Sequence, residues 1–321
     1  SGIAVPTTST YTSVKSLQLD ATDEYAYATL PSGWGKSQGS YAFWVNLNGN
    51  ATASRYLIAF TTNAYNVSEG NLDFDDFMTL HFHARATSHM AFLARARNTT
   101  TQQNKFSTVA LQTGATSSHG YPYNRTNAAF TSIQQNMVTS SSSLVTNNVW
   151  THVVVTWDTD SSLTYSYGSS GTLTGLTKIY INGELRNIGQ GEGIPSDTQQ
   201  ADAKSLIART AELTTMYVGS ISAGYHTPAT ASYDGIGIWT SVLDANNVAA
   251  IYNSGAPTDL SVNAGNYNQK ANLVGYWKMD STTSNGTVTV ADSNGNNNNN
   301  NPLTLVSGPT LTTNTPTREK G

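Results

Sequence analysis

The sequence predicts an all-β sandwich, and the clearest evidence lies between Trp150 and Asn187. Two β-branched and aromatic segments, WTHVVVTWD and TKIYINGELRN, are joined there by a polar connection rich in Gly, Ser and Thr. The dipeptide Asn182-Gly183 favours a tight turn after the second segment. Alternation within the first segment sends its first and third valines and its second tryptophan to one face. We therefore expect a hairpin of strands with a sandwich core on one side.

A second hairpin is predicted over residues 78–97, because apolar and polar residues alternate on both sides of a Thr-Ser-His loop. The two apolar sets share a face only if the loop has an odd number of residues, so we predict a loop at residues 87–89. This register pairs large side chains with small ones, for example Phe92 with Ala84. On the other face it places His81 opposite Arg95.

The polar face of this second hairpin is a candidate binding surface. It carries the candidate ligand-binding residues His81, His83, Arg85, Arg95 and Arg97. Their donors suit an anionic or hydroxyl-rich ligand such as an acidic glycan. The competing interpretation is a sheet surface that faces solvent or another subunit. Zinc is less favoured, because the two histidines have no identifiable third ligand nearby.

Five segments occur in the order found in the laminin-G-like, concanavalin A-like jelly roll, and the chain resembles that family. They span residues 16–255 and read SLQLDATDEYAYA, GSYAFWVNL, the WTHVVVTWD and TKIYINGELRN pair, MYVGS, and ASYDGIGIWTSVLDANNVAAIYNSG. In the last segment Asp244 is expected to cap a short helix that reaches Asn253. The resemblance implies a domain over residues 1–258.

Residues 259–321 depart from the family pattern and form a carboxy-terminal extension. Its segments NLVGYWKMDST, TVTVADSNGN and PLTLVSGP resemble the usual beginning of such a module, here placed at the end. The extension either adds strands to the same sandwich or belongs to a second module that pairs with a neighbouring subunit. Chain economy favours the first arrangement.

Trp44 is the aromatic residue that the alternation of its strand sets apart. Tyr41, Phe43, Val45 and Leu47 form one face and are expected in the core, which leaves Trp44 on the other face. In sugar-binding jelly rolls exposed aromatic rings stack on pyranose faces, so Trp44 is a candidate ligand-binding residue. A tryptophan packed under a loop is the alternative.

Asp20, Asp23 and Asp234 form a candidate calcium site. Related jelly rolls often hold Ca²⁺ near the first break, together with an acid from the closing strand, and oxygen ligands suit this cation. The competing interpretation is that Asp20 and Asp23 cap a turn.

Composition excludes several classes of function. Only 11% of residues are charged and the formal net charge is −4, so no basic stripe is present to bind nucleic acid. Without cysteine, disulfides and zinc-thiolate sites are impossible. No apolar run reaches membrane-spanning length.

An enzyme is not expected. The glucanases of this fold use a Glu-x-Asp-x-x-Glu strand, and no glutamate of this chain has an aspartate two residues later. The Cys-free, Ser/Thr/Asn-rich style and the LVGYW tail are similar to laminin-G-like proteins of marine phages and bacteria. This similarity implies a virion decoration or fibre protein on the virion surface, in a homo-oligomer or larger assembly, that contacts capsid or a host glycan. The alternative is a secreted or cell-surface carbohydrate-binding lectin domain.

Overall fold

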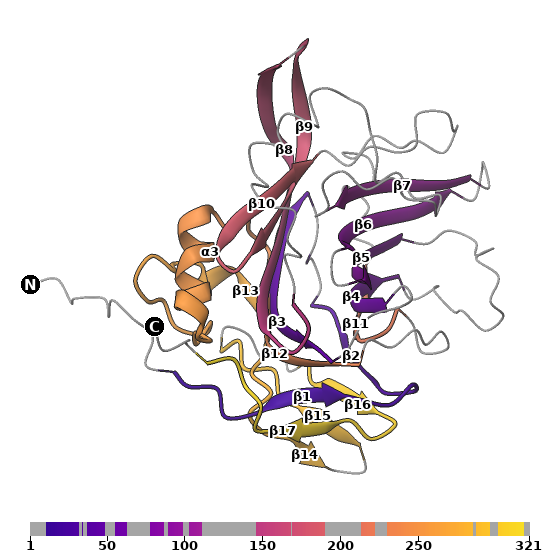
Figure 1. Cartoon of the computed structure of the whole chain (residues 1–321), viewed down its shortest axis with the longest axis vertical. Coiled ribbons are helices and arrows are strands. Elements are labelled where there is room, and N and C mark those ends of the chain that lie inside the picture. The colour runs from indigo at the N-terminus through magenta and orange to yellow at the C-terminus, as the bar shows by residue number, and fades with distance from the viewer. Residues whose placement is uncertain are drawn as a thin grey trace, which may run out of the picture.

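The protein is described from a computed structural model (Figure 1). It describes residues 11–31, 34, 37–48, 55–62, 78–86, 89–98, 103–110, 146–167, 169–189, 213–221, 230–284, 287–295 and 301–317. Within the strands at residue 55 and residues 78–110, 163–175 and 187–189, only the backbone is described. Two antiparallel sheets make up the fold, which confirms the predicted all-β jelly-roll sandwich. No helix in these ranges is long and apolar enough to span a membrane.

The first sheet has eight strands. In spatial order they are β10 (Glu184–Gly189), β9 (Ser169–Ile181), β8 (Trp150–Tyr167), β3 (Gln38–Leu47), β12 (Ala231–Trp239), β1 (Ser16–Leu19) and β17 (Thr310–Thr312), with β13 (Leu273–Trp277) also paired to β12. Strands β1 and β13 both pair with β12, β1 along residues 231–233 and β13 along residues 236–239. The carboxy-terminal strand β13 therefore pairs with β12 beyond the point where β1 ends.

The second sheet has nine strands. They are β14 (Thr283–Ser284), β15 (Val288–Val290), β16 (Leu303–Val306), β2 (Tyr25–Thr29), β11 (Thr215–Val218), β4 (Arg55–Thr61), β5 (Met78–Ala86), β6 (His89–Asn98) and β7 (Gln103–Ala110). Three strands of the carboxy-terminal extension pair with earlier strands of the same chain: β13 with β12, β16 with β2 and β17 with β1. Strand β15 pairs with β16, and β14 pairs with β15. The domain boundary at residue 258 stays a prediction.

The main core lies between the two sheets. The predicted inward residues of β3 and β8, among them Phe43 and Trp157, are fully buried in it. The Trp34 ring meets Trp157 edge-on at 5.5 Å and lies 4.6 Å from the Phe60 ring. Interlocking aromatic rings of this kind bury large apolar areas and fix how the sheets are set against each other.

A second apolar cluster covers the outer face of the first sheet. It includes Val154, Trp239, Val248 and Tyr276, all fully buried. The helix α3 (Ala245–Tyr252) lies on this side of the sheet, away from the second sheet (Figure 1). The 3-10 turns η2 (Asn253–Gly255) and η3 (Lys270–Asn272) follow it. The second face of β8, which carries His152, Val154 and Thr156, is therefore also buried, because the chain after β12 packs over it.

The predicted turns and helix are confirmed. Asn182 and Gly183 both have positive φ (51° and 81°) and connect β9 to β10. Asp244 caps α3 by accepting a hydrogen bond from the Asn247 amide at 2.8 Å. The polar connection between β8 and β9 is different from the expectation, because it continues both strands as a long hairpin with an irregularity after Asp158.

The hairpin of β5 and β6 forms as predicted, but the predicted register is wrong. Phe82 pairs with Phe92, Ala84 with Met90 and His81 with Leu93. The strands end at Ala86 and His89, so the connection has two residues, and a bulge then lies between Ala84 and Ala86. The shorter connection and the extra residue on β5 each shift the pairing by one residue, so the register differs from the predicted one by two.

Candidate functional site

Trp44 marks the candidate site, on the outer face of the first sheet. Its ring lies 4.8 Å from the ring of His152, its partner on β8, and 5.8 Å from that of Tyr252, with which it is stacked. The indole also approaches β12, where a Cβ on Gly235 would come within 3.3 Å of it. Trp44 is only 3% exposed. It therefore lies on the predicted face, under the end of α3.

Tyr252 reaches this position because of the way α3 ends. The next residue, Asn253, adopts the left-handed conformation (φ 48°), and its amide donates to the Ala249 carbonyl. Ser254 (φ 55°) and Gly255 (φ 96°) are also left-handed. Such residues stop a helix sharply. The helix thus ends with a half-buried tyrosine whose ring lies against the sheet.

The β9–β10 turn packs closely against Tyr252. The Asn182 side-chain oxygen accepts a hydrogen bond from the His152 amide, and the Asn182 amide donates to the His152 carbonyl, both at 2.9 Å. These bonds fix the turn to β8. A Cβ on Gly183 would lie 2.8 Å from Cδ1 of Tyr252. Glycine is therefore required here by the backbone and by the ring.

A pocket of about 410 Å³ opens beside these rings. We call it the aromatic pocket, and its described lining residues are Trp44, Asn148, Val149, Trp150, Asn182, Tyr252, Ser254, Gly255 and Thr317. Trp150 and Tyr252 are half-buried, whereas Val149 is 44% exposed at its margin. Ligand pockets commonly measure roughly 300 to 1,000 Å³. The aromatic pocket is thus large enough for a small ligand or the end of a longer one.

The carboxy-terminal segment completes one side of the pocket. Nε1 of Trp150 donates to the side-chain oxygen of Asn314 at 3.2 Å, and the Ser16 hydroxyl donates to the Asn314 carbonyl at 2.6 Å. These contacts hold residues 312–317 across the ends of β1 and β8, which places Thr317 at the pocket. Segments from five separate parts of the chain therefore meet at this site.

The described lining of the aromatic pocket is uncharged. It offers amide and hydroxyl groups together with aromatic rings. Behind Trp44, complete burial lowers the pKa of His152 to about 3, and no hydrogen-bond partner of its Nδ1 is found in the described part of the chain. His152 is therefore neutral at physiological pH, and the pocket can bind through ring stacking and neutral hydrogen bonds.

The predicted basic face on β5 and β6 lies elsewhere, on the second sheet. The register places Thr79 opposite Arg95, and His83 opposite Ala91. His81, His83, Arg85, Arg95 and Arg97 are described by their backbone only, and their side chains lie outside the described part of the structure. Ligand binding at this face stays a prediction.

The three aspartates of the candidate calcium site lie apart. Asp20 and Asp23 are exposed at the end of β1, whereas Asp234 is fully buried four pairs further along, roughly 13 Å away at strand spacing. The turn at Asp20 is capped by Glu24, whose carboxylate accepts the amides of Asp20 and Ala21. Among the described residues no group of three acidic or histidine side chains could hold a metal ion. Calcium binding stays a prediction.

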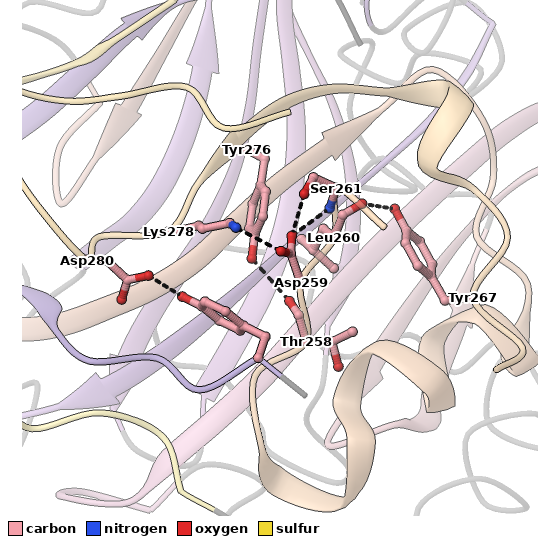
Figure 2. A network of polar contacts seen from close by, with 9 residues as sticks. Thr258, Asp259, Leu260, Ser261, Tyr267, Tyr276, Lys278 and Asp280 are labelled. Carbon is pink, nitrogen blue, oxygen red and sulfur yellow. Dashed lines mark hydrogen bonds and ion pairs between the residues drawn. The ribbon is translucent and has the colours of Figure 1, made fainter. Parts of the chain in front are cut away.

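Two further described carboxylates, those of Asp259 and Asp280, belong to a polar network near the amino-terminal residues (Figure 2). Asp259 accepts hydrogen bonds from Ser261 and from Lys278 at 2.9 Å, and these bonds outweigh burial and lower its pKa. Asp280 accepts the Tyr11 hydroxyl at 2.7 Å. The network holds the amino-terminal residues against the segment that follows α3.

Sequence reasoning placed Trp44 on the correct face but missed Trp150, Asn182 and Tyr252 as site residues. The available signal was the Asn-Gly turn and the Tyr-Asn-Ser-Gly helix end. Each indicates local geometry, and neither says that a turn and a helix end 70 residues apart lie side by side.

Comparison with known proteins identifies no family. No family model matches the chain, and no curated protein matches it. Among solved structures, a protein of Bacteroides ovatus to which carbohydrate binding is ascribed has 16% identity and a TM-score of 0.48 over 95% of this chain. The chain spans 62% of that protein.

Two further structures are similar at lower scores. The CBM40 domain of the Ruminococcus gnavus IT-sialidase, bound to α2,3-sialyllactose, has 12% identity and a TM-score of 0.39, with 75% of this chain and all of that domain covered. The enzymatically active domain of tailspike protein 2 of bacteriophage CBA120 has 9% identity and a TM-score of 0.42 over 80% of this chain and 29% of that one.

Proposed function

We propose that the protein is a non-enzymatic glycan-binding module and that the aromatic pocket is its binding site. One observation carries this proposal: Trp44, Trp150 and Tyr252 line the same pocket as amide and hydroxyl side chains. A sugar ring has an apolar face of C–H groups and a rim of hydroxyls. Aromatic rings pack on the face, and the groups of Asn148 and Asn182 can donate to and accept from the rim.

The three aromatic residues have different parts in this proposal. Trp150 and Tyr252 are half-buried, so their rings offer surface to a sugar. Trp44 is almost wholly buried and stacks on Tyr252. We therefore assign direct stacking to Trp150 and Tyr252, and assign to Trp44 the positioning of Tyr252 beside the pocket.

Binding without catalysis is favoured by the chemistry of the pocket. Hydrolysis of a glycosidic bond ordinarily requires two carboxyl groups on opposite sides of the bond. The described lining contains no carboxyl group. Asp259 and Asp280 are engaged in the network of Figure 2 instead.

The pocket favours the lectin alternative over a purely structural role in a virion. A capsid contact is expected to be broad and buried over a large area, whereas a concave pocket with a few polar groups suits a small hydroxyl-rich ligand. We propose that the module lies on an exposed surface, where it can contact glycans. Attachment to a virion and assembly into a homo-oligomer stay predictions.

A glycan array tests this proposal with three proteins: wild type, Trp150→Ala and the control Tyr27→Ala. Tyr27 is 37% exposed on the second sheet, so its removal deletes a surface ring away from the pocket. Wild type and Tyr27→Ala are expected to bind the same glycans. Trp150→Ala should weaken that binding by about tenfold, since losing a stacked ring costs about 1.4 kcal/mol or more. An array without any bound glycan, or binding that Trp150→Ala retains, contradicts the proposal.

A further inference from the structure

Trp150 is one of the two rings proposed to stack on a sugar, and it is the first residue of β8. It pairs with Asn46, two residues from the pair of His152 with Trp44, so it lies on the same outer face of the sheet as Trp44. Its side chain is half-buried, so packing covers only part of the indole. A partly covered side chain at the end of a strand has several staggered rotamers open to it. A contact to the indole nitrogen would therefore decide its orientation.

That contact comes from the carboxy-terminal segment. Nε1 of Trp150 donates to Oδ1 of Asn314 at 3.2 Å. The indole N–H is the hydrogen-bonding group of a tryptophan side chain, and it can only donate. Because this N–H lies in the plane of the ring, the bond occupies one edge of the indole and not its faces. The oxygen of Asn314 therefore fixes the ring in a way that is compatible with stacking.

The backbone of this segment is held independently of the Asn314 side chain. The buried Ser16 hydroxyl donates to the Asn314 carbonyl at 2.6 Å, directly after the pairing of β17 with β1. Pro316 is buried two residues later, and Thr317 lines the pocket. We call residues 312–317 the carboxy-terminal clasp. Removal of the Asn314 side chain should therefore free the indole while the clasp stays in place.

We infer that Asn314 is a positioning residue of the aromatic pocket and acts through Trp150; this inference rests on the proposed glycan-binding function. Asn314 holds the indole in a single orientation, in which the ring can stack on a sugar. Without the side-chain oxygen the indole is distributed over several rotamers, and the apparent affinity falls with the fraction of molecules in the competent one. The carboxy-terminal clasp thus belongs to the binding site as well as to the sandwich.

Calorimetric titration with the array glycan that wild type binds most strongly tests this role. Asn314→Ala should weaken binding by about three- to tenfold, the loss expected for one hydrogen bond. Asn314→Asp has the same shape and keeps an acceptor oxygen, so it should bind within about twofold of wild type. Thr310→Ala is the control, because it removes an exposed side chain from β17 shortly before the clasp. It should bind as wild type does.

A double-mutant cycle shows whether Asn314 acts through the indole. If it does, Trp150→Ala combined with Asn314→Ala should bind as weakly as Trp150→Ala alone, because the oxygen then has no ring to position. Additive losses, or unchanged affinity in Asn314→Ala, would overturn the inference and leave the proposed function intact. A wild type that binds no glycan, or binding that Trp150→Ala retains, would overturn the proposed function and the inference with it.

The indole N–H signal of Trp150 gives a readout that needs no glycan. The chain has six tryptophans, and the signal that Trp150→Ala removes from a ¹⁵N-correlation spectrum is that of Trp150. A hydrogen-bonded proton is protected, so exchange with water should be at least about threefold faster in Asn314→Ala than in wild type. Asn314→Asp should restore the wild-type rate. Equal rates in wild type and Asn314→Ala would show that this bond does not hold the ring, against the inference.

Discussion

Asp234 is the residue whose environment departs most from what its sequence context indicates. It lies on β12 opposite Trp44, is fully buried, and accepts a hydrogen bond from the Ser13 hydroxyl at 2.6 Å. Burial raises its pKa well above the ordinary value, and the nearby charge of Asp280 adds to this, while the bond from Ser13 opposes it. The folded protein therefore holds a proton on this carboxyl group more tightly than the unfolded chain does.

The raised pKa of Asp234 makes the stability of the folded protein depend on pH. The stabilisation from Asp234 is fully present below the pKa of the unfolded chain and is lost as the pH rises through the raised pKa of the folded state. Asn cannot titrate and resembles the protonated acid. We therefore expect Asp234→Asn to melt close to wild type near about pH 4 and above wild type near about pH 8.

Thermal melts of both proteins across this range provide the measurement. The difference between them cancels the contributions of titrating groups that do not interact with Asp234. Asp280 and Tyr11 do interact with Asp234, so their coupling to it is part of the measured difference. A difference in melting temperature that does not vary with pH would contradict the raised pKa.

At the scale of single residues, alternation along the chain predicted one site residue well. It placed Trp44 on the face opposite Phe43, and the structure agrees. Its burial could not be predicted, because Tyr252 covers it from more than 200 positions later in the chain. Strand periodicity reports the face on which a side chain lies, and only the fold determines what lies on top of it.

At the scale of elements, the β9–β10 turn and the end of α3 fix each other. Gly183 has a φ of 81°, and any Cβ there would meet the Tyr252 ring. Gly183→Ala should cost about 1 to 2 kcal/mol in backbone strain and should also push Tyr252 from its position. We expect it to weaken glycan binding by about tenfold, the loss expected when one stacked ring is displaced.

Gly308→Ala is the matched control for this prediction. Gly308 also has a positive φ, 95°, but a Cβ there would have nothing within 4 Å. Its alanine variant should lose a similar amount of stability and keep full binding. Chemical denaturation measures the first effect and ligand titration the second. Equal affinities for the two variants would show that the turn does not position Tyr252.

The elements themselves were largely predictable, and their registers were not. The capped helix and the Asn-Gly turn follow from local chemistry that acts within a few residues. The pairing of β5 with β6 was predicted two residues out, because a bulge after Ala84 and a two-residue connection replaced the three-residue loop. Both loops keep the apolar residues on one face, so the hydrophobic pattern could not choose between them.

At the scale of the whole molecule, the candidate site exists because later parts of the chain pack over the outer face of the first sheet. Helix α3 and the segment after it bury Trp239 and Tyr276, and residues 312–317 then reach the end of β8. The aromatic pocket lies where these coverings meet the β9–β10 turn. The fold class was predictable from the strands, but a site assembled from five distant segments was not, since its residues share no motif.

The central claim is that the aromatic pocket binds a glycan. Calorimetric titration of wild type, Tyr252→Phe and Tyr252→Ala with the glycan that binds most strongly on the array tests this claim most directly. Tyr252→Phe keeps the ring that stacks on Trp44 and should keep most of the affinity, whereas Tyr252→Ala removes it and should weaken binding by about tenfold or more. Unchanged affinity in Tyr252→Ala, with an unchanged melting temperature, would contradict the claim and place the binding site elsewhere on the molecule.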